Sequence, residues 1–151
     1  MKEKAIIGLG NPLRNDDGIG IILIGKLKQK QLIDYDIIDG GTAGINLLHI
    51  LSRYNKVILI DAFDFRSEAG DYKILDYHKL QTKINDMNIS THECNFFKVL
   101  SLSSELKEIP KKIYIFGIQP KKTSYGEKIS EELNLNINRY IDEIIKLTKE
   151  I

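Results

Sequence analysis

Two aspartates and one histidine, Asp17, Asp61 and His92, are residues of this 151-residue sequence whose types suit a divalent metal. Carboxylate oxygen and imidazole nitrogen are ligands that zinc and nickel accept, and three protein ligands leave coordination positions open for a substrate. A metal held there could polarise a carbonyl group or activate water, and a carboxylate could act as a general base. The three residues come from separate stretches of the chain, so their spacing alone is not diagnostic.

Each of these residues also has a structural alternative. Asp16 or Asp17 could cap the helix that follows, and because adjacent residues rarely point the same way, we expect only one of them to face a site. Asp61 ends an apolar run, so its carboxylate should be nearly buried and could simply accept backbone N–H bonds. His92 could be a capping or surface histidine, and Asp64 is a weaker candidate than Asp61 because it lies further from the strand end.

The remaining histidines and the single cysteine are weaker candidates for metal ligands. His49 lies within a helical apolar pattern and should be partly buried, whereas His78 lies in a polar stretch and should be on the surface. Cys94 lies two residues past His92, but one such pair is not a zinc motif, and a packing thiol is the simpler interpretation.

Two glycine-rich segments follow apolar runs. In Asp39-Gly40-Gly41-Thr42, consecutive glycines would let another backbone approach closely, so a peptide could bind there. A tight strand-to-helix turn capped by Thr42 is the alternative, and both roles could coexist. Gly8-Leu9-Gly10 is followed by Leu13 where a dinucleotide fingerprint needs its third glycine, so we do not expect NAD or FAD.

The elements that must position these residues are predicted from hydrophobic periodicity. Short apolar runs alternate with longer amphipathic ones, which predicts an α/β fold of three layers, with a mostly parallel twisted sheet of about five strands and helices on both faces. Asp17, Asp39 and Asp61 all follow predicted strands, where sites form in open parallel sheets. We expect strands at 4–9, 35–38, 56–60, 71–76 (an edge strand that could be antiparallel) and 112–117, and helices at 19–30, 45–51, the second part of 91–104, and 129–149.

The composition suits one soluble domain over residues 1–151. The net charge is +1, from 22 basic and 21 acidic residues, which offers no general attraction to nucleic acid or to an anionic membrane. No stretch approaches 18 apolar residues, and glycine, asparagine and proline at 8–12 interrupt the first apolar run before it could be a signal peptide. One cysteine cannot form an internal disulfide, so we expect a cytoplasmic protein.

Five segments, in order, resemble one family. GLGNPLRNDDGIG at 8–20, DGGTAG at 39–44, the Ile-Asp-Ala at 60–62, the Ser-Thr-His at 90–92 and GIQP at 117–120, with Gly126 and Ser130 beyond, are similar to the pattern of hydrogenase maturation endopeptidases. The resemblance covers about residues 4 to 135. It implies a peptidase that removes the C-terminal extension of a nickel–iron hydrogenase large-subunit precursor after nickel has been inserted.

The resemblance also implies roles for particular residues. The family's metal ligands fall on Asp17, Asp61 and His92, and the family accepts either Glu or Asp at the first of these positions. Asp17 and Asp61 would be the catalytic carboxylates of an aspartic-type or metal-dependent hydrolase, and the Asp39–Thr42 segment would bind substrate. The nickel would be supplied by the precursor, which is the expected partner; neither nucleic acid nor membrane is expected.

Two alternatives remain at this stage. Peptidyl-tRNA hydrolases, which are esterases, also carry GLGNP after a first strand, but they would place a histidine where this chain has Asp16-Asp17, and they tend to be basic. A metallochaperone or scaffold protein without catalytic activity could use the same fold, because a fold does not fix a function.

Overall fold

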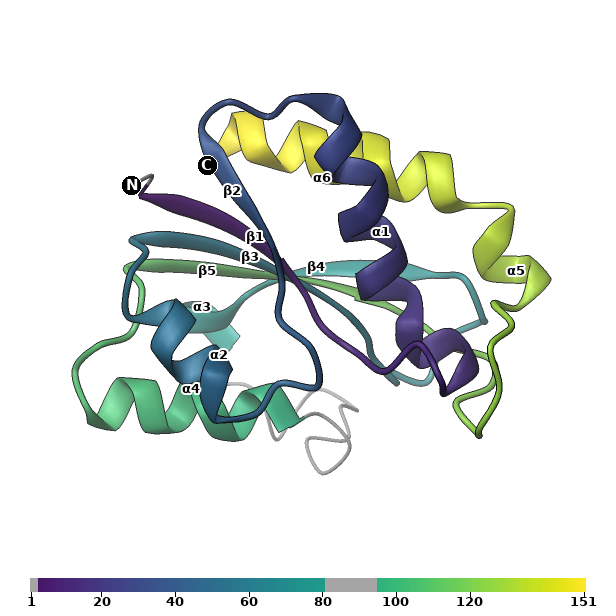
Figure 1. The fold of residues 1–151 in the computed structure, drawn as a ribbon, viewed down its shortest axis with the longest axis horizontal. Helices are drawn as coiled ribbons and strands as arrows, with labels where there is room; N and C mark the ends of the chain where they lie inside the picture. Colours follow the sequence, from purple (N-terminus) through teal and green to yellow (C-terminus); the bar gives the residue numbers. More distant parts are fainter. Residues whose placement is uncertain (1–2, 81–94) are drawn as a thin grey trace.

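The computed structural model describes residues 3–80 and 95–151, which form a five-stranded sheet between layers of helices (Figure 1). The strand order is β2-β1-β3-β5-β4. Four strands are parallel, and the edge strand β4 is antiparallel to β5. The α/β fold with a mostly parallel sheet is therefore confirmed, as is the antiparallel edge strand. The strands are β1 (Lys4–Gly8), β2 (Tyr35–Asp39), β3 (Lys56–Ala62), β4 (Tyr72–Asp76) and β5 (Lys112–Ile118).

Helices cover both faces of the sheet (Figure 1). The helices α1 (Ile19–Leu27) and α6 (Ile137–Glu150) lie on one face. The helices α2 (Ile45–Leu51), α3 (Tyr77–Leu80) and α4 (Asn95–Glu105) lie on the other. Short helical turns η1 (Asn15–Gly18), η2 (Lys28–Lys30) and α5 (Glu131–Asn134) complete the described elements. Within the described residues, no helix is long and apolar enough to cross a membrane.

The two central strands β1 and β3 have fully buried apolar residues on both faces. Ile6 and Ile58 pack in the core beneath α1 and α6, while the next residues along, Ile7 and Leu59, pack in the core beneath α2 and α4. Strand side chains alternate between faces, so a continuous apolar run serves both cores. Each such side chain contributes roughly 1.5–3 kcal/mol through burial, which makes these strands the rigid base of the sheet.

Three predicted elements differ from the structure by two residues or more, and four strands differ by one residue at one end. Ala62 pairs with Ile118, so β3 continues past residue 60 and Asp61 lies within the strand, not after it. The helix expected over 19–30 finishes as the tighter turn η2. The helix expected over 129–149 is two helices, α5 and α6, and the side-chain amide of Asn136 donates to the carbonyl oxygen of Glu132 at the break, in competition with the helical backbone.

The sheet has a topological switch point between β1 and β3. From β1 the chain continues to β2 on one side, and β3 then pairs with the other side of β1. Connections on either side of a switch point diverge, which leaves a crevice at the carboxyl ends of the two strands. Gly10 follows the end of β1 and Asp61 lies near the end of β3, so the fold brings Asp61 and the loop that carries Asp17 to this crevice.

Candidate functional site

A cleft of about 600 Å³ opens at the carboxyl end of the parallel strands. Four segments contribute to it: 10–17, 42–43 and 119–123 follow β1, β2 and β5, and 61–64 spans the end of β3 and the loop after it. Both predicted carboxylates, Asp17 and Asp61, line this one cleft. Of the three aspartates that the sequence predicted at this edge of the sheet, two therefore share a cleft, whereas Asp39 lines a second pocket.

Asp61 is a buried carboxylate, with 9% of its surface exposed. Its Oδ1 atom is buried and has no hydrogen-bond partner among the described residues. Burial raises the pKa of Asp61 well above its ordinary value, and the negative charge of Asp17 raises it further, against an opposing hydrogen bond from the Ala62 backbone N–H. A buried polar oxygen left unpaired is costly, so this atom is suited to a ligand that supplies positive charge or a proton.

Asp17 lies in the turn η1, within the loop that follows β1, and it lines the cleft. Its Oδ2 atom accepts a hydrogen bond of 2.8 Å from the backbone N–H of Asn11, which fixes the carboxylate against the loop after β1. Gly10 lies between the two aspartates: a Cβ atom there would be 1.9 Å from the Asp17 carbonyl oxygen and 3.5 Å from Asp61 Oδ1. The φ of Gly10 is +130°, so both its conformation and its surroundings require glycine.

Asp16 does not face the cleft and instead organises the loop opposite. It is fully buried, and its carboxylate accepts hydrogen bonds from the Ser130 hydroxyl (2.6 Å) and backbone N–H (2.7 Å) and from the N–H groups of Lys121 and Lys122. Burial alone would raise the pKa of Asp16, but these hydrogen bonds outweigh it and lower the pKa. Asp16 thus holds loop 120–130 in place, while Asp17 lines the cleft. The prediction that one of them caps the following helix is wrong, because neither side chain makes a capping hydrogen bond there.

The segment 39–42 is a tight turn bonded to the loop after β1. Gly10 N–H donates to Gly41 C=O, and Gly40 N–H donates to Gly8 C=O, both at 2.8 Å. A Cβ at Gly40 would lie 2.6 Å from Leu9 Cδ2, so this glycine permits close packing within the chain itself. Thr42 lines the cleft with the aspartates but does not cap α2, whose N-cap is Gly44, so that expectation was wrong. Asp39, Gly40 and Gly41 line a second pocket.

The third predicted ligand, His92, lies outside the described residues, as does Cys94. Within 3–80 and 95–151, no three His, Cys, Asp or Glu side chains gather as a metal site. Asp17 and Asp61 line one cleft, and the role of Asp17, Asp61 and His92 as metal ligands stays a prediction. Of the other histidines, His78 is exposed as expected, whereas His49 is exposed and not partly buried, because α2 buries Leu47, Leu48 and Leu51 and turns His49 outward.

Gln119 belongs to the GIQP segment, but the sequence predicted no role for this residue in the site. It is almost fully buried, and its Oε1 atom accepts bonds from the backbone N–H groups of Phe65 (2.9 Å) and Ser67 (3.1 Å). Its Nε2 atom donates to Asp64 Oδ1 at 3.2 Å. Gln119 thus fixes the loop that follows Asp61, and its position just past a parallel strand was the available signal.

Two cations, Arg14 and Lys121, also line the cleft. The Arg14 Nε donates to Thr123 C=O at 3.0 Å, and its guanidinium lies over the Tyr125 ring, which is 82% exposed. Lys121 pairs with Glu132 at 2.7 Å. The charged lining of the cleft is therefore three carboxylates, Asp17, Asp61 and Asp64, and two cations, so it suits a substrate that carries a cation.

This arrangement defines a class: a doubly wound α/β domain with a carboxylate-bearing cleft at its switch point. The family model for hydrogenase maturation protease matches residues 21–147. This range includes Asp61 and begins four residues after Asp17. The chain belongs to the hydrogenase maturation protease family.

Individual relatives agree with this assignment. The hydrogenase 2 maturation protease of Escherichia coli is 28% identical over 148 residues, covering 96% of this chain and 90% of that protein. The hydrogenase expression/formation protein HupD of Rhizobium leguminosarum is 29% identical over 117 residues, covering 76% of this chain, which spans only 58% of HupD. The structure of the hydrogenase maturating endopeptidase HybD from E. coli superposes with a TM-score of 0.82 at 25% identity, covering 99% of this chain and 93% of that one.

Proposed function

We propose that this protein is an endopeptidase that removes the C-terminal extension of a nickel–iron hydrogenase large-subunit precursor after nickel insertion. Family membership supports peptide-bond cleavage during hydrogenase maturation. The observation that carries the proposal is the buried Asp61 Oδ1, which has no hydrogen-bond partner in the described part of the chain and lies beside Asp17 in one cleft.

The carboxylate pair suits recognition of a metal that arrives with the substrate. In its absence, burial and the charge of Asp17 favour a proton on Asp61, because the raised pKa disfavours the charged form. A divalent cation would stabilise the ionised carboxylate and release that proton. Asp17, Asp61 and His92 would bind nickel in the filled precursor, and an empty precursor would lack this interaction, so the site would discriminate between them.

Two routes to peptide hydrolysis fit these residues. The substrate's metal could supply Lewis acidity at the scissile carbonyl or to a bound water molecule. Alternatively, one aspartate could accept a proton from the attacking water and return it to the leaving amine, a function that two carboxylates with separated pKa values perform in other hydrolases. In both routes, Asn11 and Gly10 hold Asp17 in place while β3 holds Asp61.

The proposal is tested with nickel-loaded and nickel-free precursor. Wild-type protein should shorten only the loaded precursor, by one peptide-bond cleavage visible in intact mass. Asp17→Asn and His92→Ala should each lower kcat/KM at least 100-fold, and Lys98→Ala, on the exposed surface of α4, should leave it unchanged. Equal cleavage of both precursors would disprove nickel recognition. Tight binding with no peptide released would favour the scaffold alternative.

A further inference from the structure

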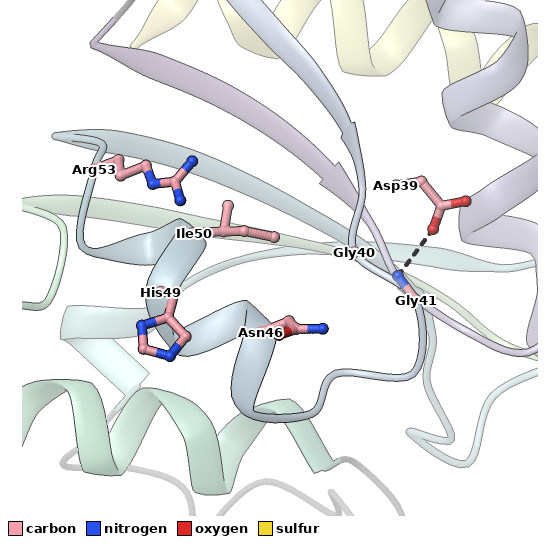
Figure 2. A pocket seen from close by; sticks show the side chains of 7 residues that line it. All are labelled: Asp39, Gly40, Gly41, Asn46, His49, Ile50 and Arg53. Carbon is pink, nitrogen blue, oxygen red and sulfur yellow. Dashed lines mark hydrogen bonds between the residues drawn. The ribbon is translucent and has the colours of Figure 1, made fainter.

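A second, shallow pocket of about 540 Å³ shares its turn with the cleft. Asp39, Gly40 and Gly41 line this pocket, and the next residues of the same turn, Thr42 and Ala43, line the cleft. The opposite wall is the exposed face of α2 (Figure 2). A chain segment that lies in this pocket would therefore reach the carboxylates after crossing a single turn.

Three polar side chains, Asn46 and His49 of α2 and Arg53 of the turn that follows it, line this pocket. Asn46 and His49 are three residues apart and so share one side of α2, Arg53 lies two residues past the helix end, and all three are exposed. Their side chains form no hydrogen bond or ion pair with any other described residue. Arg53 lies at one end of the pocket and Asp39 at the other, where its carboxylate is bonded to the Gly41 N–H (Figure 2).

The adjacent strand β2 has an open edge. Among the described strands it pairs with β1 alone, and the Gly40 N–H donates to Gly8 C=O. Because alternate residues of a strand direct their backbone groups to opposite sides, Ile38 faces β1, whereas the N–H and C=O groups of Ile37 and Asp39 face outward. In the described part of the chain these outward groups of Ile37 and Asp39 have no hydrogen-bond partner. An open strand edge is a template on which an extended peptide can add a strand.

We propose that the outer edge of β2 and the α2 face together bind an extended segment of the precursor and lead it toward the cleft. This inference rests on the proposed function. The segment would pair with the backbone of Ile37 and Asp39. It would carry an acidic side chain at the Arg53 end of the pocket, and a neutral or basic one near Asp39. Asn46 and His49 would bond its intervening polar groups.

Amide hydrogen exchange tests the strand addition directly. In the free protein, the outward N–H groups of Ile37 and Asp39 should exchange quickly, whereas the N–H of Ile38, bonded to β1, should exchange slowly. On addition of nickel-loaded precursor at saturating concentration, exchange at Ile37 and Asp39 should slow at least tenfold, with Ile38 little changed. Unaltered exchange at Ile37 and Asp39 in a saturated complex would overturn the proposal.

Charge reversal tests the pocket separately. Arg53→Glu should raise KM for precursor cleavage five- to tenfold with kcat nearly unchanged, since Arg53 lies outside the cleft. Lys146→Glu makes the same change of charge on the exposed side of α6 and should alter neither constant. An equal effect of the two variants, or a fall in kcat alone, would contradict the proposal. If wild-type protein cleaves nothing, the proposed function fails, while the exchange experiment and the affinity of Arg53→Glu for precursor still decide on this pocket.

Discussion

Asp16 and Asp17 are neighbours in the sequence but belong to different parts of the molecule. The carboxylate of Asp16 is fully buried and bonded to residues 121, 122 and 130, whereas that of Asp17 lines the cleft and accepts the Asn11 N–H. We therefore expect Asp16 to contribute mainly to the stability of the fold and Asp17 mainly to the chemistry of the cleft, and single substitutions at the two positions should have different effects.

Asp16→Asn should destabilise the protein by about 1–3 kcal/mol, because an amide cannot accept all the hydrogen bonds that converge on this carboxylate and buried donors would be left unpaired. The pKa of Asp16 is lowered in the folded protein, so its contribution to stability is present above the ordinary value of 3.8 and is lost as pH falls through the folded pKa. Urea unfolding of the variant and wild type at pH 7 and pH 3 measures both effects. Asp17→Asn, the matched control, should change stability by less than about 1 kcal/mol.

Asp61→Asn should stabilise the protein at neutral pH while abolishing cleavage. Because the pKa of Asp61 is raised in the folded state, the native protein retains a proton that the unfolded chain releases above pH 3.8. Stability is therefore lost as pH rises from 3.8 through the folded pKa. Asparagine has no charged form, so we expect a gain of roughly 1–2 kcal/mol at pH 7 and little gain near pH 3. A loss of stability at pH 7, measured by denaturant titration without added metal, would show that the carboxylate is paired in the native protein.

Gly10→Ala should be severely destabilising. The φ of +130° is unfavourable for alanine, and its Cβ would lie 1.9 Å from a backbone oxygen, so the loop that carries Asp17 must shift. We expect a loss above about 3 kcal/mol and a fall in kcat/KM beyond what instability explains. Gly25→Ala is the control: Gly25 is exposed in α1 with no atom near its Cβ position, so the same change should stabilise by about 0.5–1 kcal/mol.

Gln119→Leu should lower both stability and activity. It would leave the N–H groups of Phe65 and Ser67 unbonded and release Asp64, which costs about 1–3 kcal/mol. Thermal unfolding and precursor cleavage measure the two losses. Gln29→Leu, at an exposed position of η2, should lower neither stability nor activity. Equal behaviour of the two variants would mean that Gln119 does not hold the loop.

The fold and the two carboxylates could be predicted from the sequence because their signals are local. The apolar runs of β1 and β3 and the turn residues that follow them occupy single short stretches, and parallel strands place their carboxyl ends together. Asp16, Gln119 and Ser130 could not be understood in this way. Their long-range side-chain hydrogen bonds join residues that are 52 to 114 positions apart, and no periodicity records such a pairing.

The break between α5 and α6 has a similar cause. Apolar residues continue at helical spacing through it, and only the side chain of Asn136, together with the anchoring of Ser130 by Asp16, ends one helix and begins the next.

The prediction that His49 is partly buried was wrong for a related reason. The apolar pattern of α2 shows that one side of the helix is buried, but in a helix of seven residues the boundary of that side is poorly defined by sequence alone.

The paired hydrogen bonds between the loop after β1 and the turn after β2 limit how this protein can change. Gly40 is bonded to Gly8 and Gly10 to Gly41, so an inserted or deleted residue in either segment would displace the other and move Asp17 with it. Adaptation to a new precursor is therefore restricted to replacing side chains on a backbone of constant length. Chimaeras that exchange this turn with one of different length should lose activity toward the precursors of both parents.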